Sequence, residues 1–266
     1  MADRRVHHIT YASLKFTVSA WVLAHSARRY GLSTRIYTPR SPVARELRQQ
    51  YPEIMRQPRG VGYWLWKPYI IRDAMQNAAD GDLVLYTDSA VVFAADPAPL
   101  FAVAREHPIV LFEQAARPPE RIWTKRDCFV LLDADTAAYW ETPQLAATCQ
   151  LYRVGPEARA FIDELCRVMA NANVLTDLPN VCGLPNLPGY REHRHDQSVL
   201  TIQAVKYGLP RFRDPTQFGA MSPAGGADAA APPFGTVFNH HRSSSGKVLQ
   251  AYWRFRRAER ARARRN

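Results

Sequence analysis

The sequence has no long hydrophobic run and no closely spaced cysteines. No stretch approaches the ~18 consecutive apolar residues that a membrane span needs, and the first ten residues lack the apolar core of a secretion signal. The chain has 4 cysteines, which lie far apart and form no CxxC motif. We therefore expect free buried thiols rather than disulfides or a zinc site, and a cytoplasmic protein.

Three common signatures of catalysis and nucleotide binding are also missing. The sequence contains no Gly-x-Ser-x-Gly, no phosphate-binding P-loop and no Gly-x-Gly-x-x-Gly. Their absence argues against a serine nucleophile on a strand-to-helix turn, a P-loop nucleotidase and a dinucleotide-binding unit.

Positive charge is in excess, and much of it lies at the C-terminus. The formal net charge is +11, and residues 254–266 contain seven arginines and one glutamate. The rest of the chain is only modestly basic, which suits a nucleoside-diphosphate ligand as well as it suits nucleic acid. The basic tail, residues 253–266, either contacts an anionic membrane surface, where each basic residue contributes roughly 1 kcal/mol, or is a solvated terminus.

The spacing of apolar residues predicts an α/β fold. Strands and helices alternate through the first hundred residues, which is typical of a mixed, mostly parallel sheet flanked by helices. We expect strands at 6–11, 33–38, 83–87, 107–113 and 147–154, and helices at 14–30, 42–51, 67–79, 156–170 and 196–207. Loops are expected at 175–190 and 215–233, within a single domain that spans residues 1–252.

Asp88 directly follows the apolar strand at 83–87. In open α/β sheets, ligands bind beyond the carboxyl ends of the strands. A carboxylate there can hold Mg²⁺ or Mn²⁺ against a diphosphate, because these cations prefer hard oxygen ligands; the alternative is a carboxylate that only caps the next loop. The pair Asp80 and Asp82 precedes the strand, so it belongs to the opposite edge, where a turn is the better interpretation.

A second acidic pair, Asp133 and Asp135, is a rival metal site. It follows a short apolar run within 127–132 that is compatible with either a strand or a helix. If the run is a strand, the pair lies at a strand end and becomes the metal site. The spacing of Thr124 and Asp127 resembles a capping box and favours the helix, which would leave the pair in a loop.

Four blocks of the sequence together resemble a known family. They are residues 62–68 (GYWLWKP), 85–89 (LYTDS), 123–127 (WTKRD) and 193–198 (HRHDQS). In this order they resemble GT-A-type glycosyltransferase-like proteins, many of which occur in bacterial surface-polysaccharide contexts. The resemblance spans most of the chain. It implies the nucleotide-diphospho-sugar transferase fold and transfer of a sugar to a glycan or lipid-linked acceptor.

The resemblance also implies roles for individual residues. Related retaining transferases carry an Asp-Gln pair on a helix that faces the donor sugar, and Asp196-Gln197 is similar to that pair. Asp196 is also a candidate N-cap of its helix, because aspartate is favoured there. The related transferases use a late histidine as a metal ligand, and His240 and His241 lie in a similar position. Adjacent side chains of an extended chain point to opposite sides, so at most one of the two would hold a metal together with Asp88, and we take His240. The implied donor is a UDP- or GDP-sugar, with Mn²⁺ or Mg²⁺ as cofactor. The chain departs from the family at the strand end, where Asp-x-Asp is replaced by Asp-Ser-Ala at 88–90.

Five further residues are candidates for binding the nucleotide sugar: Trp66, Lys67, Tyr86, Lys125 and Arg126. Lys67 either neutralises the diphosphate or is a solvated lysine at a helix start. Trp66 and its aromatic neighbours either stack on the base or sugar or pack in the core. Lys125 and Arg126 either grip phosphate, as arginine does in bidentate fashion, or form a plain surface pair.

Three functions follow from these features. The first is a metal-assisted glycosyltransferase that acts in the cytoplasm, at the inner face of the membrane if the tail binds lipid. The second is a catalytically silent homologue that binds sugar nucleotides or glycans, which the single carboxylate at the strand end allows. The third is a nucleic-acid-binding protein, suggested by the pI of about 9.8 but supported by no zinc-finger, RRM or KH pattern, so no nucleic-acid partner is expected.

Overall fold

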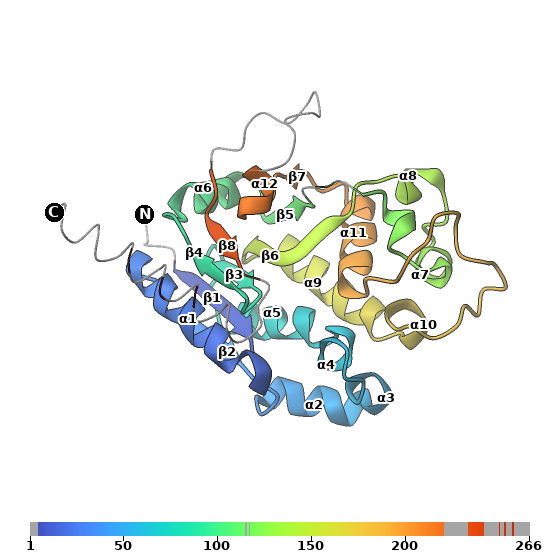
Figure 1. Ribbon diagram of the computed structural model, residues 1–266, viewed down its shortest axis with the longest axis horizontal. Helices are drawn as coiled ribbons and strands as arrows, with labels where there is room; N and C mark the ends of the chain where they lie inside the picture. Colours follow the sequence, from blue (N-terminus) through green and yellow to red (C-terminus); the bar gives the residue numbers. More distant parts are fainter. Residues whose placement is uncertain are drawn as a thin grey trace.

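A six-stranded sheet forms the centre of the protein (Figure 1). The computed structural model describes residues 5–114, 116, 118–220, 234–241, 250, 253 and 257. The strands lie in the spatial order β2 (Thr34–Tyr37), β1 (Val6–Tyr11), β3 (Leu83–Thr87), β6 (Leu145–Arg153), β5 (Ile109–Glu113) and β7 (Arg211–Phe212).

Five of these strands share one direction. β1 pairs in parallel with β2 and β3, and β7 pairs in parallel with β5. β6 runs antiparallel to both of its neighbours, β3 and β5, so β3 and β5 run parallel to each other. The prediction of a mixed, mostly parallel sheet is confirmed.

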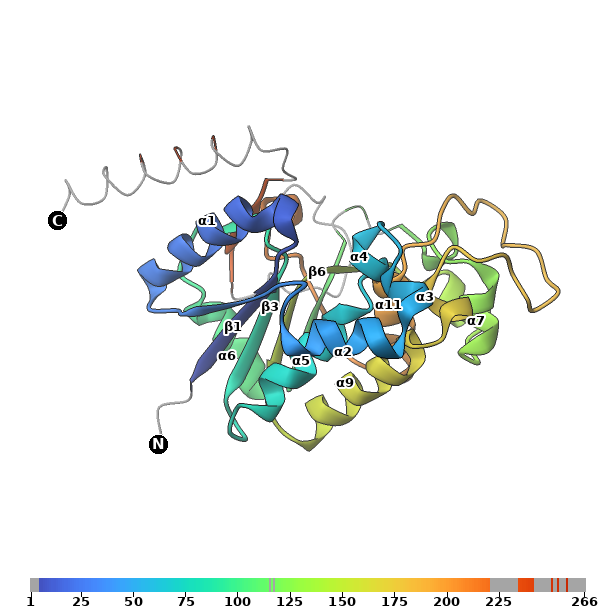
Figure 2. The same ribbon diagram turned by 90° about the horizontal axis from the view of Figure 1, so that it is seen from below.

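Helices cover both faces of the sheet. Alternate residues of β3 point to opposite faces. Leu83 and Leu85 pack in the cluster of α1 (Thr17–Ala27) and α6 (Ala98–Glu106), and Val84 and Tyr86 pack in the cluster on the other face. Figure 2 shows α1 on one side of the strands and α5 and α9 on the other. Because both faces are buried, the strand is apolar throughout rather than alternating.

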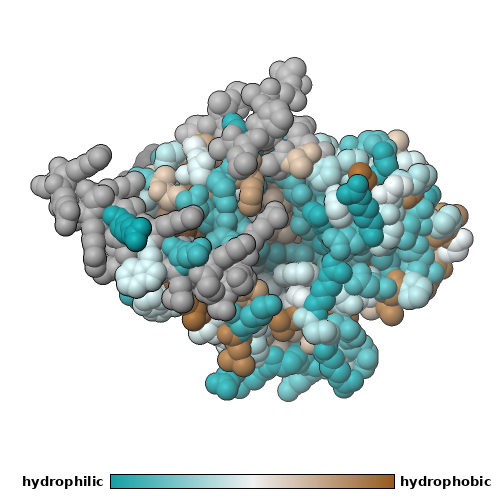
Figure 3. Space-filling model, in the orientation of Figure 1, coloured by the Kyte–Doolittle hydropathy of each residue, from teal (hydrophilic) through white to brown (hydrophobic). Residues whose placement is uncertain are grey.

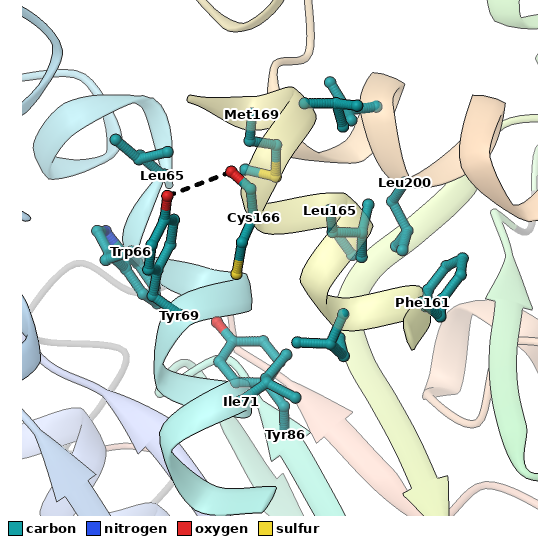
Figure 4. Packing of buried hydrophobic residues seen from close by; sticks show 14 of the residues in the cluster. Leu65, Trp66, Tyr69, Ile71, Tyr86, Phe161, Leu165, Cys166, Met169 and Leu200 are labelled. Atoms are coloured by element: carbon teal, nitrogen blue, oxygen red, sulfur yellow. Dashed lines mark hydrogen bonds between the residues drawn. The ribbon is translucent and has the colours of Figure 1, made fainter. Parts of the chain in front are cut away.

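The larger core lies between the sheet and the helices α2 (Pro42–Gln50), α5 (Trp66–Gln76), α9 (Pro156–Met169) and α11 (Asp196–Lys206). Figure 4 shows Tyr69 of α5 facing α9, where its hydroxyl donates to the Cys166 carbonyl oxygen at 3.2 Å. Leu165 of α9 faces Leu200 of α11 in the same view. These contacts fix the start of α5 and the start of α11 relative to the sheet, and both helix starts belong to the site described below.

Shorter helices connect these elements. They are α3 (Pro52–Met55), α4 (Gly60–Tyr63), α7 (Arg126–Leu131), α8 (Ala137–Trp140), α10 (Ala172–Leu175) and α12 (Gln217–Ala220), with 3-10 turns at Leu14–Phe16, Arg28–Tyr30 and Glu120–Ile122. All five predicted strands and all five predicted long helices are present, within a few residues at their ends. The ambiguous run at 127–132 is helical, so the helix interpretation is right.

One local prediction is wrong, and one small sheet was not predicted. The capping box fails because the Thr124 hydroxyl contacts Glu120 and Ser198, and the Asp127 carboxylate accepts backbone N–H bonds from a loop, from Val181 and Cys182. A second small sheet was not foreseen: β4 (Val91–Phe93) pairs antiparallel with β8 (Phe238–His240). Strands of three residues are too short for a periodic signal.

The cysteines are free, as predicted, and three of the four are buried; Cys182 is half-buried. Among the described residues, no helix is long and apolar enough to cross a membrane. On the face shown in Figure 3, hydrophilic residues predominate and hydrophobic ones are scattered. Most of the loop at 215–233 and most of the basic tail lie outside the described residues.

Candidate active site

Polar residues from five elements meet at the carboxyl edge of the sheet. Asp88 follows β3, Gln114 follows β5 and Asp214 lies just beyond β7. Since β6 runs in the opposite direction, its first half reaches the same edge, and the Thr148 carbonyl oxygen accepts the Asp88 N–H at 2.8 Å. α11 begins there with Asp196. Ligand sites of open α/β sheets form at such an edge.

These residues line a cleft with two halves, of about 360 Å³ and about 280 Å³. Thr148, Arg194 and Gln197 line both halves, which makes them parts of one cleft. The first half is also lined by Arg59, Trp64, Lys67, Asp88, Ala147, Glu192, His195 and Asp196. The second is also lined by Gln114, Ala116, Ala146, Asp214, Thr216, Phe218 and His240. Lys67, Asp88, Asp196, Gln197 and His240, which the sequence analysis named as candidates, all line this cleft.

Lys67 joins the two predicted carboxylates. Its ammonium lies 2.5 Å from Asp196, 3.8 Å from Asp88 and 3.1 Å from the Ala147 carbonyl oxygen. The side chain is 4% exposed. Lys67 is therefore not a solvated lysine at a helix start, and its ammonium is held in one place. Burial acts to lower the pKa of Lys67, but Asp196 and Asp88 outweigh burial and the net shift is upward. Lys67 therefore stays charged, and it is a fixed positive charge at the cleft wall.

Asp196 does not cap its helix. The N-cap residue of α11 is His195, and Asp196 is the first helical residue. One oxygen of its carboxylate, Oδ2, accepts a short hydrogen bond from the Lys67 ammonium. Asp88 is more open: its side chain is 32% exposed, and one oxygen accepts the Tyr86 hydroxyl at 2.6 Å. Asp88 thus presents a carboxylate to the cleft with partners on its inner side.

Amide hydrogen bonds fix the orientation of Gln197. Its Nε2 donates to Gln144 Oε1 at 3.1 Å, and Gln114 Nε2 donates to the same oxygen at 2.8 Å. The Gln114 carbonyl oxygen accepts from Arg194 Nη1 at 3.3 Å. With its NH₂ group used inward, Gln197 has its carbonyl oxygen available toward the cleft that it lines.

The aromatic candidates divide between core and cleft. Trp66 is 4% exposed, stacks on Tyr11 with ring centroids 4.0 Å apart, and donates its indole N–H to the Gly60 carbonyl at 2.9 Å. The fully buried Tyr86 contacts the site only through its hydroxyl on Asp88. Trp64 does line the cleft. The core interpretation therefore describes Trp66, and Trp64 is the aromatic side chain of the 62–68 block that is placed to meet a ligand.

A strained turn presents Trp64. Val61, Tyr63 and Trp64 all have positive φ values of 52–59°, which is rare for residues with a Cβ. Gly60 is required there, because a Cβ on it would lie 2.4 Å from the Trp64 ring. The Tyr63 ring lies 4.5 Å from the ring of His195, which also has a positive φ of 50°. Strain of this kind often marks functional sites.

Lys125 and Arg126 lie outside both halves of the cleft. Lys125 is 3% exposed, donates to the Leu178 carbonyl oxygen at 2.7 Å and lies 3.6 Å from Asp127. Arg126 forms a two-nitrogen contact with Asp135. Both hold the loop after α10 and the end of α7, which leaves their predicted contact with phosphate without geometric support. The rival pair Asp133 and Asp135 follows a helix, as the loop alternative required.

Among the described residues, no group of three or more histidines, cysteines, aspartates or glutamates could hold a metal. The residues expected as ligands are nonetheless on one cleft, with Asp88 in the first half and His240 in the second. A carboxylate and an imidazole suit Mn²⁺ or Mg²⁺ only with further oxygen ligands, such as those of a diphosphate.

Sequence reasoning missed Arg59, Arg194, Gln114 and Gln144. Gln114 carried a usable signal, because it directly follows an apolar strand as Asp88 does. Arg194 stood in the HRHDQS block, and its guanidinium stacks over Trp123 at 3.6 Å from the ring centroid. Arg59 and Gln144 had no local signal; only the fold brings them to the site.

Comparison with known proteins identifies the fold. No family model matches the sequence, and no curated protein matches it. Among solved structures, the galactosyltransferase LgtC in complex with donor and acceptor sugar analogs is similar over 91% of this chain and 88% of its own, with a TM-score of 0.51 and 13% identity. Mouse xyloside xylosyltransferase 1 is similar over 91% of this chain and 99% of its own, with a TM-score of 0.48 and 10% identity.

A glycosyltransferase involved in glycosylation of the major capsid of PBCV-1 is similar over 93% of this chain and 99% of its own, with a TM-score of 0.48 and 12% identity. The likeness to LgtC shows that this chain has a GT-A-like glycosyltransferase fold, and the predicted fold class is confirmed.

Proposed function

We propose that this protein is a glycosyltransferase that moves a sugar from a nucleoside-diphospho-sugar donor to a glycan or lipid-linked acceptor. The observation that carries the proposal is the cluster of Asp88, Lys67, Asp196 and Gln197 in one cleft at the carboxyl edge of a GT-A-like sheet. Fold alone does not imply function, but these side chains provide what a displacement at an anomeric carbon needs.

The charges of the cleft suit a diphosphate leaving group. Lys67 and Arg194 would stabilise the negative charge that develops on the nucleoside diphosphate as the glycosidic bond breaks. Their positions are fixed by other side chains, so little reorganisation is needed during the reaction. Arg59 adds a third positive charge to the lining, although it also contacts Glu192 at 3.1 Å.

Asp196 and Gln197 would act on the sugar. Asp196 would accept hydrogen bonds from sugar hydroxyls while paired with Lys67. The carbonyl oxygen of Gln197 would lie against the anomeric carbon, where its partial negative charge favours an oxocarbenium-like centre. The acceptor hydroxyl then attacks that carbon. Retention of configuration follows only from the resemblance to Asp-Gln transferases, and we propose it on that basis.

We further propose that Mn²⁺ or Mg²⁺ binds together with the donor, held by Asp88 and His240. The fit rests on the partly exposed carboxylate of Asp88, which lines the cleft, and on the position of His240 in the other half of the same cleft. When bound, the metal supplies positive charge against the diphosphate. UDP- and GDP-sugars are the donors that we would test first.

A thermal-shift panel of nucleoside diphosphates and nucleotide sugars, with and without Mn²⁺, tests the proposal. A ligand present at 100 times its dissociation constant adds ~2.7 kcal/mol of stability, which such a measurement detects. Donors that stabilise the protein then enter a transfer assay with glycan acceptors and water. If no nucleotide sugar shifts the melting temperature and none is consumed, the protein is not a glycosyltransferase.

A catalytically silent sugar-nucleotide-binding protein is the second candidate. The observation in its favour is Ala90, which stands where a second strand-end carboxylate is usual in the family that the sequence resembles. This candidate predicts donor binding in the thermal-shift panel with no turnover of any bound donor.

A further inference from the structure

Glu120 is a buried carboxyl group that the proposed mechanism does not use. Its side chain is 0% exposed and lies in the turn before α7. Its Oε1 contacts the Thr124 hydroxyl and accepts from Gln144 Nε2 at 3.4 Å, and its Oε2 has no hydrogen-bond partner among the described residues. An interior carboxylate with an orphaned oxygen is costly, so the geometry favours the neutral acid.

The hydroxyls around Glu120 also favour the neutral acid. Ser198 donates its only proton to the Trp123 carbonyl oxygen at 2.8 Å, so the 2.8 Å contact between Thr124 and Ser198 uses the Thr124 proton. The Thr124 oxygen is then left to accept a hydrogen bond, which a protonated Glu120 can donate. Ionisation would reverse this chain, because Thr124 would have to donate to Glu120 instead.

Charged and titratable neighbours are few. Arg211, from β7, acts to lower the pKa of Glu120, and the thiol of Cys128, from α7, stays protonated because burial raises its pKa. From α11, Ser198 and Thr201 contribute hydroxyls only, and Thr201 donates to the backbone carbonyl oxygen of Gln197 at 2.8 Å. Burial dominates, and it raises the pKa of Glu120 to about 8.

Glu120 is connected to the cleft through one side chain. Gln144 uses its NH₂ group toward Glu120, which turns its carbonyl oxygen toward Gln197 and Gln114. That oxygen accepts both of their NH₂ groups. Glu120 accepts from Gln144 and so sets the orientation of the Gln144 amide. The Gln144 amide in turn sets the direction of its hydrogen bonds with Gln197 and Gln114.

We propose that Glu120 is a positioning residue: it orients the Gln144 amide so that Gln197 presents its carbonyl oxygen, and not its NH₂ group, to the cleft. We call the path from Glu120 through Gln144 to Gln197 the relay. Its expected effect on kcat rests on the proposed function, but the hydrogen bonds of the relay do not. Without the acceptor on Glu120, Gln144 can rotate by 180° about its last bond, and Gln197 loses the partner that holds its NH₂ group inward.

Two substitutions at one position separate positioning from packing. Glu120→Gln resembles the neutral acid, because it can accept from Gln144 and donate to Thr124; it should retain kcat at pH 7. Glu120→Leu offers no acceptor; it should lower kcat by about ten-fold or more, with nucleotide affinity within about two-fold of wild type. Equal kcat values for the Leu variant and wild type, or equal losses in both variants, would overturn the proposal.

The pH profile is the second kinetic readout. A carboxylate accepts from the Gln144 NH₂ group at least as well as the neutral acid does. The relay should therefore hold when Glu120 ionises, and wild type and Glu120→Gln should have the same kcat profile at alkaline pH. An alkaline fall of kcat in wild type that is absent from Glu120→Gln would overturn the role of Glu120 as an acceptor. If Glu120→Leu does not fold, Gln144→Met breaks the same relay one residue further on and should show the same split between kcat and affinity.

A readout without turnover keeps the relay separate from the proposed function. The side-chain ¹⁵N–H₂ signals of Gln144 and Gln197 should shift between pH 6 and pH 9 in wild type and stay constant in Glu120→Gln. Constant signals in wild type would contradict the relay. Shifting signals in a protein that transfers no sugar would leave the relay standing and remove the proposed function.

Discussion

The ammonium of Lys67 lies 2.5 Å from the carboxylate of Asp196, a residue 129 positions further along the chain. The pair is almost fully buried, with side chains 4% and 8% exposed. Lys67 is the second residue of α5, Asp196 is the first residue of α11, and the two helix starts meet at the carboxyl edge of the sheet. Removing either partner leaves an uncompensated charge in the interior, which costs far more than loss of a surface ion pair.

Asp196→Ala is expected to destabilise the fold by ~3–5 kcal/mol, because it leaves the buried Lys67 ammonium with the Ala147 carbonyl oxygen and with Asp88 as its nearest carboxylate, at 3.8 Å. Asp196→Asn keeps an oxygen for Lys67 and should fold. It should lower kcat by ~100-fold while nucleotide inhibition stays nearly unchanged, because the residue would contact sugar and not diphosphate. Urea denaturation and steady-state kinetics measure the two effects.

The double variant Lys67→Met/Asp196→Leu is the matched control for stability. It removes both charges, so it should recover most of the stability lost in Asp196→Ala and remain inactive. Asp196→Asn with full activity would contradict the assignment of Asp196 to the sugar.

Asp88→Asn should remove the metal-dependent part of nucleotide binding. The amide oxygen can still accept the Tyr86 hydroxyl, so the fold should be unchanged, and the gain in affinity on adding Mn²⁺ should fall by ~10- to 100-fold. Titration calorimetry with UDP and GDP measures it. Asp133→Asn is the control, since this exposed aspartate lies in the loop after α7. Unchanged metal dependence in Asp88→Asn would show that Asp88 is not the ligand.

Lys125→Met should act on a loop and not on nucleotide. It removes the contact with the Leu178 carbonyl oxygen and leaves Asp127 without its cation. We expect faster proteolysis of the loop at 176–192 and nucleotide affinity within about two-fold of wild type. Limited proteolysis and calorimetry test both. A large loss of nucleotide affinity with the loop still protected would restore the phosphate-binding prediction for Lys125 and Arg126.

His8 should make the protein sensitive to acid. It is buried between Thr34 and Thr87, and burial lowers its pKa to about 3, below the ordinary value of 6.5. Below pH 6.5, His8 is protonated in the unfolded chain, whereas in the folded chain it stays neutral down to about pH 3. Each pH unit in that window costs ~1.4 kcal/mol of stability, hence ~2 kcal/mol at pH 5.

The variant His8→Gln can keep hydrogen bonds to the two threonines and has no proton to gain. The loss of stability between pH 7 and pH 5, measured by urea denaturation, should therefore be smaller in the variant by about that amount. Equal losses would show that His8 does not carry this pH dependence.

The basic tail is expected to matter for membrane attachment and not for catalysis. Seven arginines follow Trp253, whose side chain is exposed. A chain that ends at Tyr252 should keep its kcat and should sediment less with anionic vesicles than the full chain, most clearly at low salt. Equal sedimentation of the two proteins would rule out the membrane role.

The sequence by itself determined the secondary structure and one edge of the site. Apolar runs bounded by turns identified the strand of Leu83–Thr87, and the rule that ligands bind beyond the carboxyl ends of strands then placed Asp88. These features depend on neighbours within a few residues, which a sequence displays directly. The resemblance in four blocks added Asp196 and Gln197.

Only the tertiary structure decided which of the charged and amide side chains meet. Lys67, Gln114 and Gln144 come from separate elements, and their partners are set by helix packing and by the one reversed strand. Lys125 and Arg126 looked like ligand residues in the sequence, yet they hold a loop instead. The charge of a residue does not show in the sequence which partner it will have. The burial and the hydrogen bonds that fix its partner exist only once the helices and strands have packed.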